Sequence, residues 1–198
     1  MYTEKFKGFI SMPSKTFDKY KKESSDMAFK YLIVFSVIMA IIAAVVAGIV
    51  FAVAGAAASM FLPPTIPLGM LGAFSGLFTV TVFFAVLIGT VVGMVIWSLW
   101  LHLWIYVLGG KKGIDQTFKA VFYGHTPMYV LFWIPFVNLI VMLWAFVLQG
   151  IGIKKLHGLT GGKAAAAIIV ALIIPILIIA AIVGPALMYA QTMNPMIY

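Results

Sequence analysis

Long runs without a charged residue constrain this sequence more than any other feature. Asp, Glu, Lys and Arg are absent from four runs, which are residues 31–62, 68–108, 120–153 and 164–190. About 20 apolar residues are enough for a helix to cross the hydrocarbon core of a bilayer. A soluble domain carries about a quarter charged residues, whereas this chain has 9% and is 64% hydrophobic. The sequence therefore predicts an all-α, polytopic membrane helical bundle.

The charged residues lie in three short segments that indicate the topology. Every basic residue is a lysine, and all of them fall within residues 1–30, 111–119 and 154–163. Short basic loops tend to stay on the cytoplasmic side of a membrane. All three segments can share that side only if residues 120–153 form two short spans joined by a turn at Pro135. This arrangement predicts five transmembrane helices, with the N-terminus inside and the C-terminus outside.

The second uncharged run is too long for one ordinary span, since residues 68–108 would form a straight helix of about 60 Å. In one interpretation, Leu68 to Gly76 is a re-entrant or interfacial piece that precedes the second span. In the other, the run contains two spans with a turn near Gly89. The second interpretation would place Lys111 and Lys112 opposite the lysine-rich N-terminus, so the lysines favour the first.

The chain divides into three parts on this basis. Residues 1–30 are predicted to be a cytoplasmic amphipathic segment, residues 31–190 the five-span membrane domain, and residues 191–198 a short extracytoplasmic tail. After Pro13, aromatic residues follow a roughly helical spacing while the lysines lie off that stripe. Such a helix can lie on an anionic membrane surface, seated by Phe9, Phe17 and Tyr20. A solvated lead-in helix fits the same pattern.

Small residues mark faces where helices can approach closely. In the first run they recur every fourth position, at Ala40, Ala44, Gly48 and Ala52. In the second run, Gly89 and Gly93 mark a similar face. Small residues let helices pack in lipid, where apolar side chains gain nothing over the lipid itself. We expect these faces to pack within the chain, with a homo-oligomer interface as the alternative.

Three polar residues within the predicted spans are candidates for a buried cluster. The helical rise of 1.5 Å per residue places each of them within about 15 Å of a lysine-bearing segment. They are His102, His125 and Gln149. We therefore predict an intramembrane polar cluster of these three side chains. Interhelical hydrogen bonds explain it most simply. A metal or proton site is the alternative, with His102 and His125 as its candidate ligands. His157, beside Lys154 and Lys155, is interpreted either as meeting lipid phosphates or as a solvated helix end.

Several function classes lack the residues that they need. No charged residue lies inside a predicted span, although ion-coupled pumps usually require one. No hydrolase motif is present, so no catalytic residue and no cofactor are predicted. Nucleic-acid binding is not expected, because the basic charge is confined to short segments and contains no arginine. These observations favour a protein that is not an enzyme.

Motifs spread along the chain resemble those of the Yip family, five-span membrane proteins that interact with Ypt and Rab GTPases. The opening MPSKTFDKYKKE is similar to the family's Pro-Ser lead-in, and Gly109-Gly110 with Phe118, Tyr123 and Pro127 resembles its run across the second and third spans. IPFVNLIVMLW and the later GIKKLHG and Gly162-Lys163-Ala164 are similar to its fourth-span exit. The resemblance implies a non-enzymatic membrane protein. The cytoplasmic segment lacks the Asp-Leu-Tyr-Gly-Pro motif of trafficking members, so GTPase binding is not implied, and the compact chain suggests a prokaryotic member.

Together these observations predict a membrane scaffold or adaptor in membrane organisation or trafficking-type processes. Its expected location is the cell membrane, or the Golgi or ER membrane in a eukaryote. The expected partners are the lipid bilayer and its anionic lipids, with a protein at the cytoplasmic face and a second copy of the chain as candidate partners. The alternative function is a small-solute or metal-ion transporter or channel that uses the histidine cluster. The lysines predicted to face lipid or a partner are Lys111, Lys112, Lys119, Lys154, Lys155 and Lys163.

Overall fold

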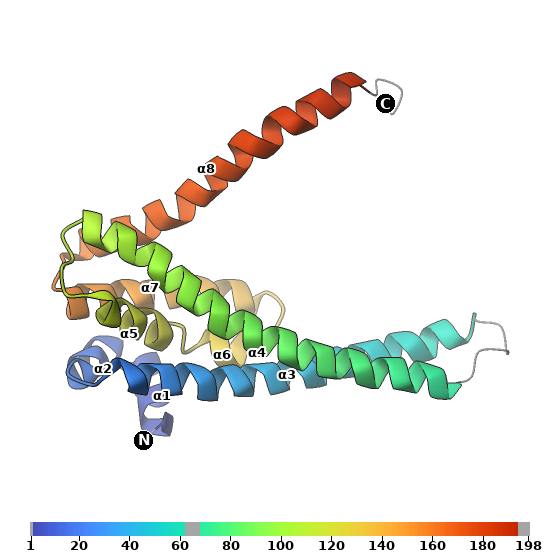
Figure 1. Cartoon of the computed structure of the whole chain (residues 1–198). Coiled ribbons are helices and arrows are strands. Elements are labelled where there is room, and N and C mark those ends of the chain that lie inside the picture. Colours follow the sequence, from blue (N-terminus) through green and yellow to red (C-terminus); the bar gives the residue numbers. More distant parts are fainter. Residues whose placement is uncertain (1, 62–67, 194–198) are drawn as a thin grey trace.

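The computed structural model describes residues 2–61 and 68–193, and all of its regular elements are α-helices. Figure 1 shows the N-terminal helices, the end of α4 and the start of α8 at the same end of the molecule. Two short helices, α1 (Tyr2–Ser11) and α2 (Pro13–Tyr20), precede the long ones. The all-α prediction is confirmed. The part of the predicted tail beyond residue 193 lies outside the described residues.

The two longest helices, α3 (Ser25–Ser59) and α4 (Leu68–Val107), pack side by side as an antiparallel pair (Figure 1). Helix α4 is continuous, so the structure has neither a turn near Gly89 nor a separate piece at Leu68 to Gly76. Both interpretations of the second run were wrong on this point. Glycine lowers helix propensity, but a bilayer provides no water to bond an opened backbone, so an apolar run favours an unbroken helix.

The predicted pair of short spans takes a less regular form. Helix α5 (Ile114–Gly124) and the single turn of α6 (Met128–Leu131) precede α7 (Val137–His157). The chain breaks between α5 and α6 because Pro127 has no amide hydrogen and disfavours helical geometry at the preceding residue. The turn predicted at Pro135 is present, and Phe136 there has a φ of 64°.

Four helices are long and apolar enough to cross a membrane in the described part of the chain. Helices α5 and α6 are each too short to do so alone, so the predicted count of five spans is not confirmed. The four candidate spans are Ser25–Ser59, Gly72–Val107, Val137–His157 and Gly161–Ala186.

Helix α5 packs tightly against α7 because both helices carry glycine at their contact. A Cβ atom at Gly124 would lie 2.8 Å from the backbone nitrogen of Gln149, and one at Gly152 would lie 3.0 Å from Cα of Ala120. Real Cβ atoms essentially never come so close as the first of these distances. The two helices therefore approach with their backbones almost in contact, as small residues permit in membranes.

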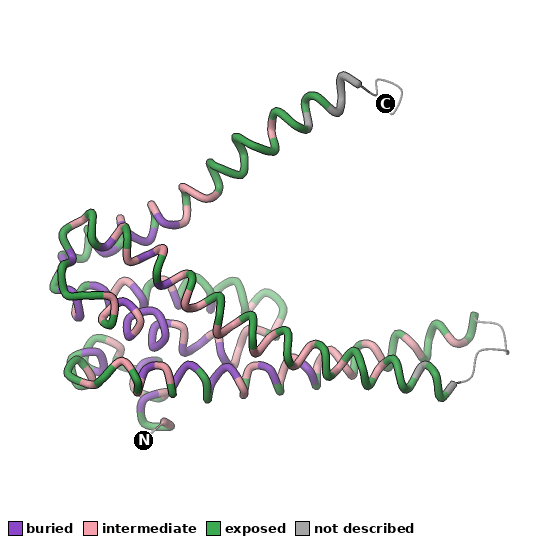
Figure 2. Tube along the Cα trace, in the orientation of Figure 1, coloured by how far each residue is buried: buried purple, intermediate pink, exposed green. Residues whose placement is uncertain are grey.

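The buried residues gather at one end of the bundle (Figure 2). The outer halves of α3, α4 and α8 (Gly161–Met193) are mostly exposed, and α8 leads away from the other helices (Figures 1 and 2). The exposed side chains there are apolar, as expected of surfaces in contact with lipid. The largest buried aromatic side chains of the core are Phe9, Phe17, Tyr31, Phe122, Tyr123 and Tyr129.

The small-residue faces differ in what they contact. A Cβ at Gly48 would lie 2.7 Å from Thr79 Oγ1 of α4, and Ala40 and Ala44 are buried. This part of the face therefore packs within the chain, whereas Ala52 is exposed. No atom lies within 4 Å of a Cβ built at Gly89 or Gly93. The close helix packing predicted at these two glycines is absent, because α8 diverges from α4 beside them.

Candidate functional site

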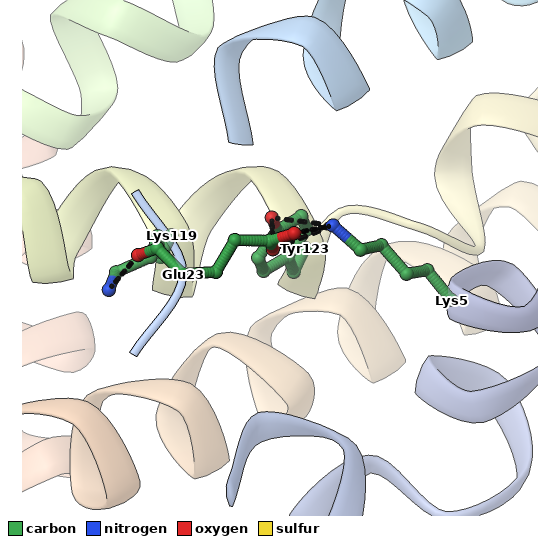
Figure 3. Close-up of polar contacts among 4 residues, drawn as sticks. All are labelled: Lys5, Glu23, Lys119 and Tyr123. Carbon is green, nitrogen blue, oxygen red and sulfur yellow. Dashed lines mark hydrogen bonds and ion pairs between the residues drawn. The ribbon is translucent and has the colours of Figure 1, made fainter. Parts of the chain in front are cut away.

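The candidate site lies at the lysine-bearing end of the bundle, which we define by α1, α2 and the five lysines 111, 112, 154, 155 and 163. At its centre is Glu23, in the link between α2 and α3. Its carboxylate accepts hydrogen bonds from Lys5 Nζ at 2.6 Å and from Tyr123 Oη at 2.6 Å (Figure 3). Lys5 is fully buried and forms an ion pair with Glu23. A buried ammonium requires such a partner, so this pair fixes α1 to the α2–α3 link, and the Tyr123 hydroxyl joins both to α5.

Lys119 of α5 completes the attachment from the other side. Its Nζ donates to the backbone oxygens of Lys21 at 2.9 Å and Glu23 at 3.0 Å. Figure 3 shows Lys119 and Tyr123 reaching the same short segment of chain. Lys119 is only 3% exposed. It was predicted to face lipid or a partner, and this prediction was wrong because the ammonium binds carbonyls left free at the end of α2.

Aromatic stacking holds the two N-terminal helices in place. The ring of Phe9 lies 4.8 Å from both Phe17 and Tyr123, measured between centroids. Phe9 and Phe17 are buried, so they do not face lipid or a partner as predicted. Tyr20 is half-buried, with its ring 4.6 Å from Lys5 Nζ. These three residues seat the N-terminal helices on the protein and not on the membrane surface.

Two more exposed ion pairs lie around this attachment. Lys155 of α7 binds Asp18 of α2 at 2.6 Å, and Lys19 binds Glu4. Lys19 donates a hydrogen bond to the Glu4 carboxylate, which lowers the pKa of Glu4 and raises the pKa of Lys19. Exposed pairs of this kind contribute little to stability. Lys155, like Lys119, is therefore engaged within the chain, although it remains partly exposed.

Four lysines remain exposed on the same end of the molecule, from the α4–α5 loop and from the adjoining ends of α7 and α8. Lys112 Nζ lies 3.1 Å from a Cβ built at Gly158, and Lys163 Nζ lies 3.8 Å from one at Gly109, so the loop and the helix junction adjoin. We call the set Lys111, Lys112, Lys154 and Lys163 the lysine surface.

Beneath the lysine surface, two histidines are joined through a threonine. His102 Nδ1 lies 2.7 Å from Thr117 Oγ1, which lies 3.0 Å from His157 Nε2. His157 is 4% exposed, so it neither meets lipid phosphates nor forms a solvated helix end. The sequence offered no sign of this contact, because Thr117 and His157 are far apart in the chain and come together only through the α5–α7 packing.

The predicted polar cluster is divided between two places. His102 contacts Thr117 and His157, whereas His125 and Gln149 line a separate cavity between α4 and α7. Gln149 Oε1 accepts a hydrogen bond from Trp97 Nε1 at 2.9 Å. Within residues 2–61 and 68–193, no group of three or more His, Cys, Asp or Glu side chains could hold a metal ion. A zinc-type site at His102 and His125 is therefore not assembled.

Comparison with known proteins identifies one family. The model of the Yip1 domain matches residues 7–183, which is most of the chain. No curated protein and no solved structure matched. The match includes the second half of α1 and all of α2, so Phe9, Phe17 and Glu23 of the N-terminal attachment lie within the matched residues.

Proposed function

The chain belongs to the Yip1 domain family, and on this premise we propose that it is a non-enzymatic scaffold or adaptor of the cell membrane. It is a multi-pass membrane protein with long apolar helices. The observation that supports an adaptor is the lysine surface, whose four side chains are exposed and come from adjoining segments, whereas Lys5, Lys119 and Lys155 bond within the chain. The proposed occupants are anionic lipid headgroups and an acidic segment of a partner protein.

The proposal includes the topology. Helix α7 is about 31 Å long, and both α5 and α6 pack against it. We propose that α5 and α6 together make the third of five crossings, with the lysine-bearing end on the cytoplasmic side. The asymmetry of the lysines supports this orientation. A lysine surface at that side would meet the negative charge of a cytoplasmic leaflet, which attracts each nearby Lys by about 1 kcal/mol.

The test compares two variants in native membranes, each of which loses four positive charges. One variant changes the lysine surface to glutamine, at Lys111, Lys112, Lys154 and Lys163. The matched control changes four exposed lysines of the N-terminal helices and their link, at Lys7, Lys15, Lys21 and Lys22. After crosslinking and affinity purification, we expect the first variant alone to lose the captured acidic protein or anionic lipid. Equal capture by both variants would contradict the proposal. Deleting residues 1–30 is a poorer test, because it would remove Phe9 and Phe17 from the core.

A further inference from the structure

A cavity of about 260 Å³ lies where α4, α6, α7 and α8 meet. Three methionines line it, each from a different helix: Met94 of α4, Met128 of α6 and Met142 of α7. His125, just before α6, lines the same cavity. The fold thus gathers three thioether groups and one imidazole that are dispersed along the sequence.

The imidazole in this cavity has an unused nitrogen. His125 Nδ1 is buried and has no hydrogen-bond partner among the described residues. The ring packs edge-on against Tyr129, with centroids 5.1 Å apart, so an aromatic contact holds it. The nearby Gln149 oxygen is already occupied by the Trp97 indole. Burying a polar atom without a partner costs about 1 to 3 kcal/mol, so a ligand for this nitrogen would remove a real penalty.

We propose that this cavity is a binding site for the cuprous ion, with His125 Nδ1 and the thioether sulfurs as its ligands. Thioethers are soft donors that select Cu(I), whereas Mg²⁺, Ca²⁺ and Mn²⁺ require oxygen ligands. Structural zinc sites use thiolate, imidazole and carboxylate, and no thiolate or carboxylate lines this cavity. A monovalent ion on four neutral donors also places less charge in an apolar interior than a divalent ion would.

The methionine side chains are suited to such a site. Methionine is unbranched and has three rotatable bonds, so each sulfur can change its position by side-chain rotation. Methionine also fills irregular gaps in cores. Gap filling alone, however, gives no reason for the imidazole that lines the same cavity to keep a buried nitrogen without a partner. The proposal rests on this cavity and does not depend on the scaffold function.

The experiment uses the full chain in lipid nanodiscs, under anaerobic conditions, with Cu(I) supplied as its bicinchoninate complex. We expect the intact protein to withdraw one Cu(I) per chain from the chelator. X-ray absorption at the copper edge should show sulfur and nitrogen neighbours. Failure to compete with the chelator, or uptake of zinc in preference to copper, would overturn the proposal.

Variants of matched volume locate the site. His125→Phe keeps a ring against Tyr129 and removes the nitrogen, and Met94→Leu, Met128→Leu and Met142→Leu together remove the sulfurs at nearly constant volume. Each variant should weaken Cu(I) binding more than about tenfold, since even outer groups of metal sites contribute that much. The exposed Met70→Leu and Met188→Leu, and His102→Phe at the other histidine pair, should bind as the intact chain does.

Folding is checked separately by circular dichroism and thermal unfolding of the metal-free proteins. If the triple variant fails to fold, Met142→Leu alone serves in its place, because Met142 is partly exposed and tolerates change best. Unchanged copper affinity in the folded cavity variants would refute the site. If His102→Phe weakens copper binding while His125→Phe leaves it unchanged, the copper belongs to the other histidine pair. That outcome would also refute the proposed site.

Discussion

The ring of Phe17 on α2 lies directly over Gly152 on α7, where a Cβ would come within 2.8 Å of the ring carbon Cζ. The contact joins the N-terminal helices to the membrane bundle at a point where only glycine leaves room. It shows that the N-terminal segment is a packed part of the domain.

Gly152→Ala is therefore expected to loosen the N-terminal helices. The new methyl group would clash with Phe17 and with Cα of Ala120, and overpacking of this kind costs about 1 to 3 kcal/mol. We expect a lower thermal midpoint and faster trypsin cleavage at the N-terminal lysines. Gly150→Ala is the control on the same helix, because its nearest neighbour would lie at an ordinary 3.6 Å. Equal effects of the two substitutions would contradict the packing described here.

Glu23→Gln should destabilise the same attachment by a different route. It leaves the fully buried Lys5 ammonium without its counter-charge, and removing one partner of a buried pair costs about 3 to 5 kcal/mol. Glu23 is partly exposed, so the lower end of that range is expected. Thermal unfolding in detergent measures the loss. Adding Lys5→Met should recover much of it, since the orphaned charge is then gone. The exposed Asp26→Asn is the control. No recovery in the double variant would argue against a buried pair.

Alanine at two glycines of α3 should change stability in opposite directions. Alanine is favoured over glycine within a helix by about 1 kcal/mol. Gly55 has no atom within 4 Å of an added Cβ, so Gly55→Ala should stabilise the protein by up to that amount. Gly48→Ala should destabilise it, because its Cβ would lie 2.7 Å from Thr79 Oγ1. Thermal unfolding of the two variants checks the sign, and stabilisation by both would show that α3 and α4 do not pack there.

The proposed third crossing is tested by cysteine labelling, for which the chain has no background because it contains no cysteine. Lys112→Cys marks the lysine-bearing end, and Asn138→Cys marks the start of α7. If α5 and α6 cross the membrane, an impermeant maleimide applied to intact cells should label Asn138→Cys and spare Lys112→Cys until the cells are opened. Ser59→Cys, at the end of α3, is the control for the outer side. Labelling of Asn138→Cys only after the cells are opened would exclude the five-span arrangement.

Hydropathy and charge alone were sufficient to predict an all-α membrane bundle whose lysine-bearing segments lie at the same end (Figure 1). Hydropathy and charge are local properties: a bilayer favours apolar helices, and most lysines stay where water reaches them, with Lys5 and Lys119 as buried exceptions. The turn at Pro135 was predictable because proline removes a helical hydrogen bond and the lysines on both sides of residues 120–153 favour two short spans there. Proline alone does not decide the matter, since Pro175 and Pro185 lie within the continuous helix α8. The Yip family resemblance, spread over the whole length of the sequence, is confirmed by the Yip1 domain match.

Only the tertiary structure decided which of the polar groups meet. Lys119 looked like any other surface lysine, yet it is buried against two carbonyl oxygens at the end of α2. His102 was expected beside His125, but the approach of α5 to α7 at Gly124 and Gly152 places Thr117 and His157 next to it. Such contacts join residues far apart in the chain. They depend on how closely two helices approach. Glycine permits a close approach, but no local sequence pattern specifies which two helices make it.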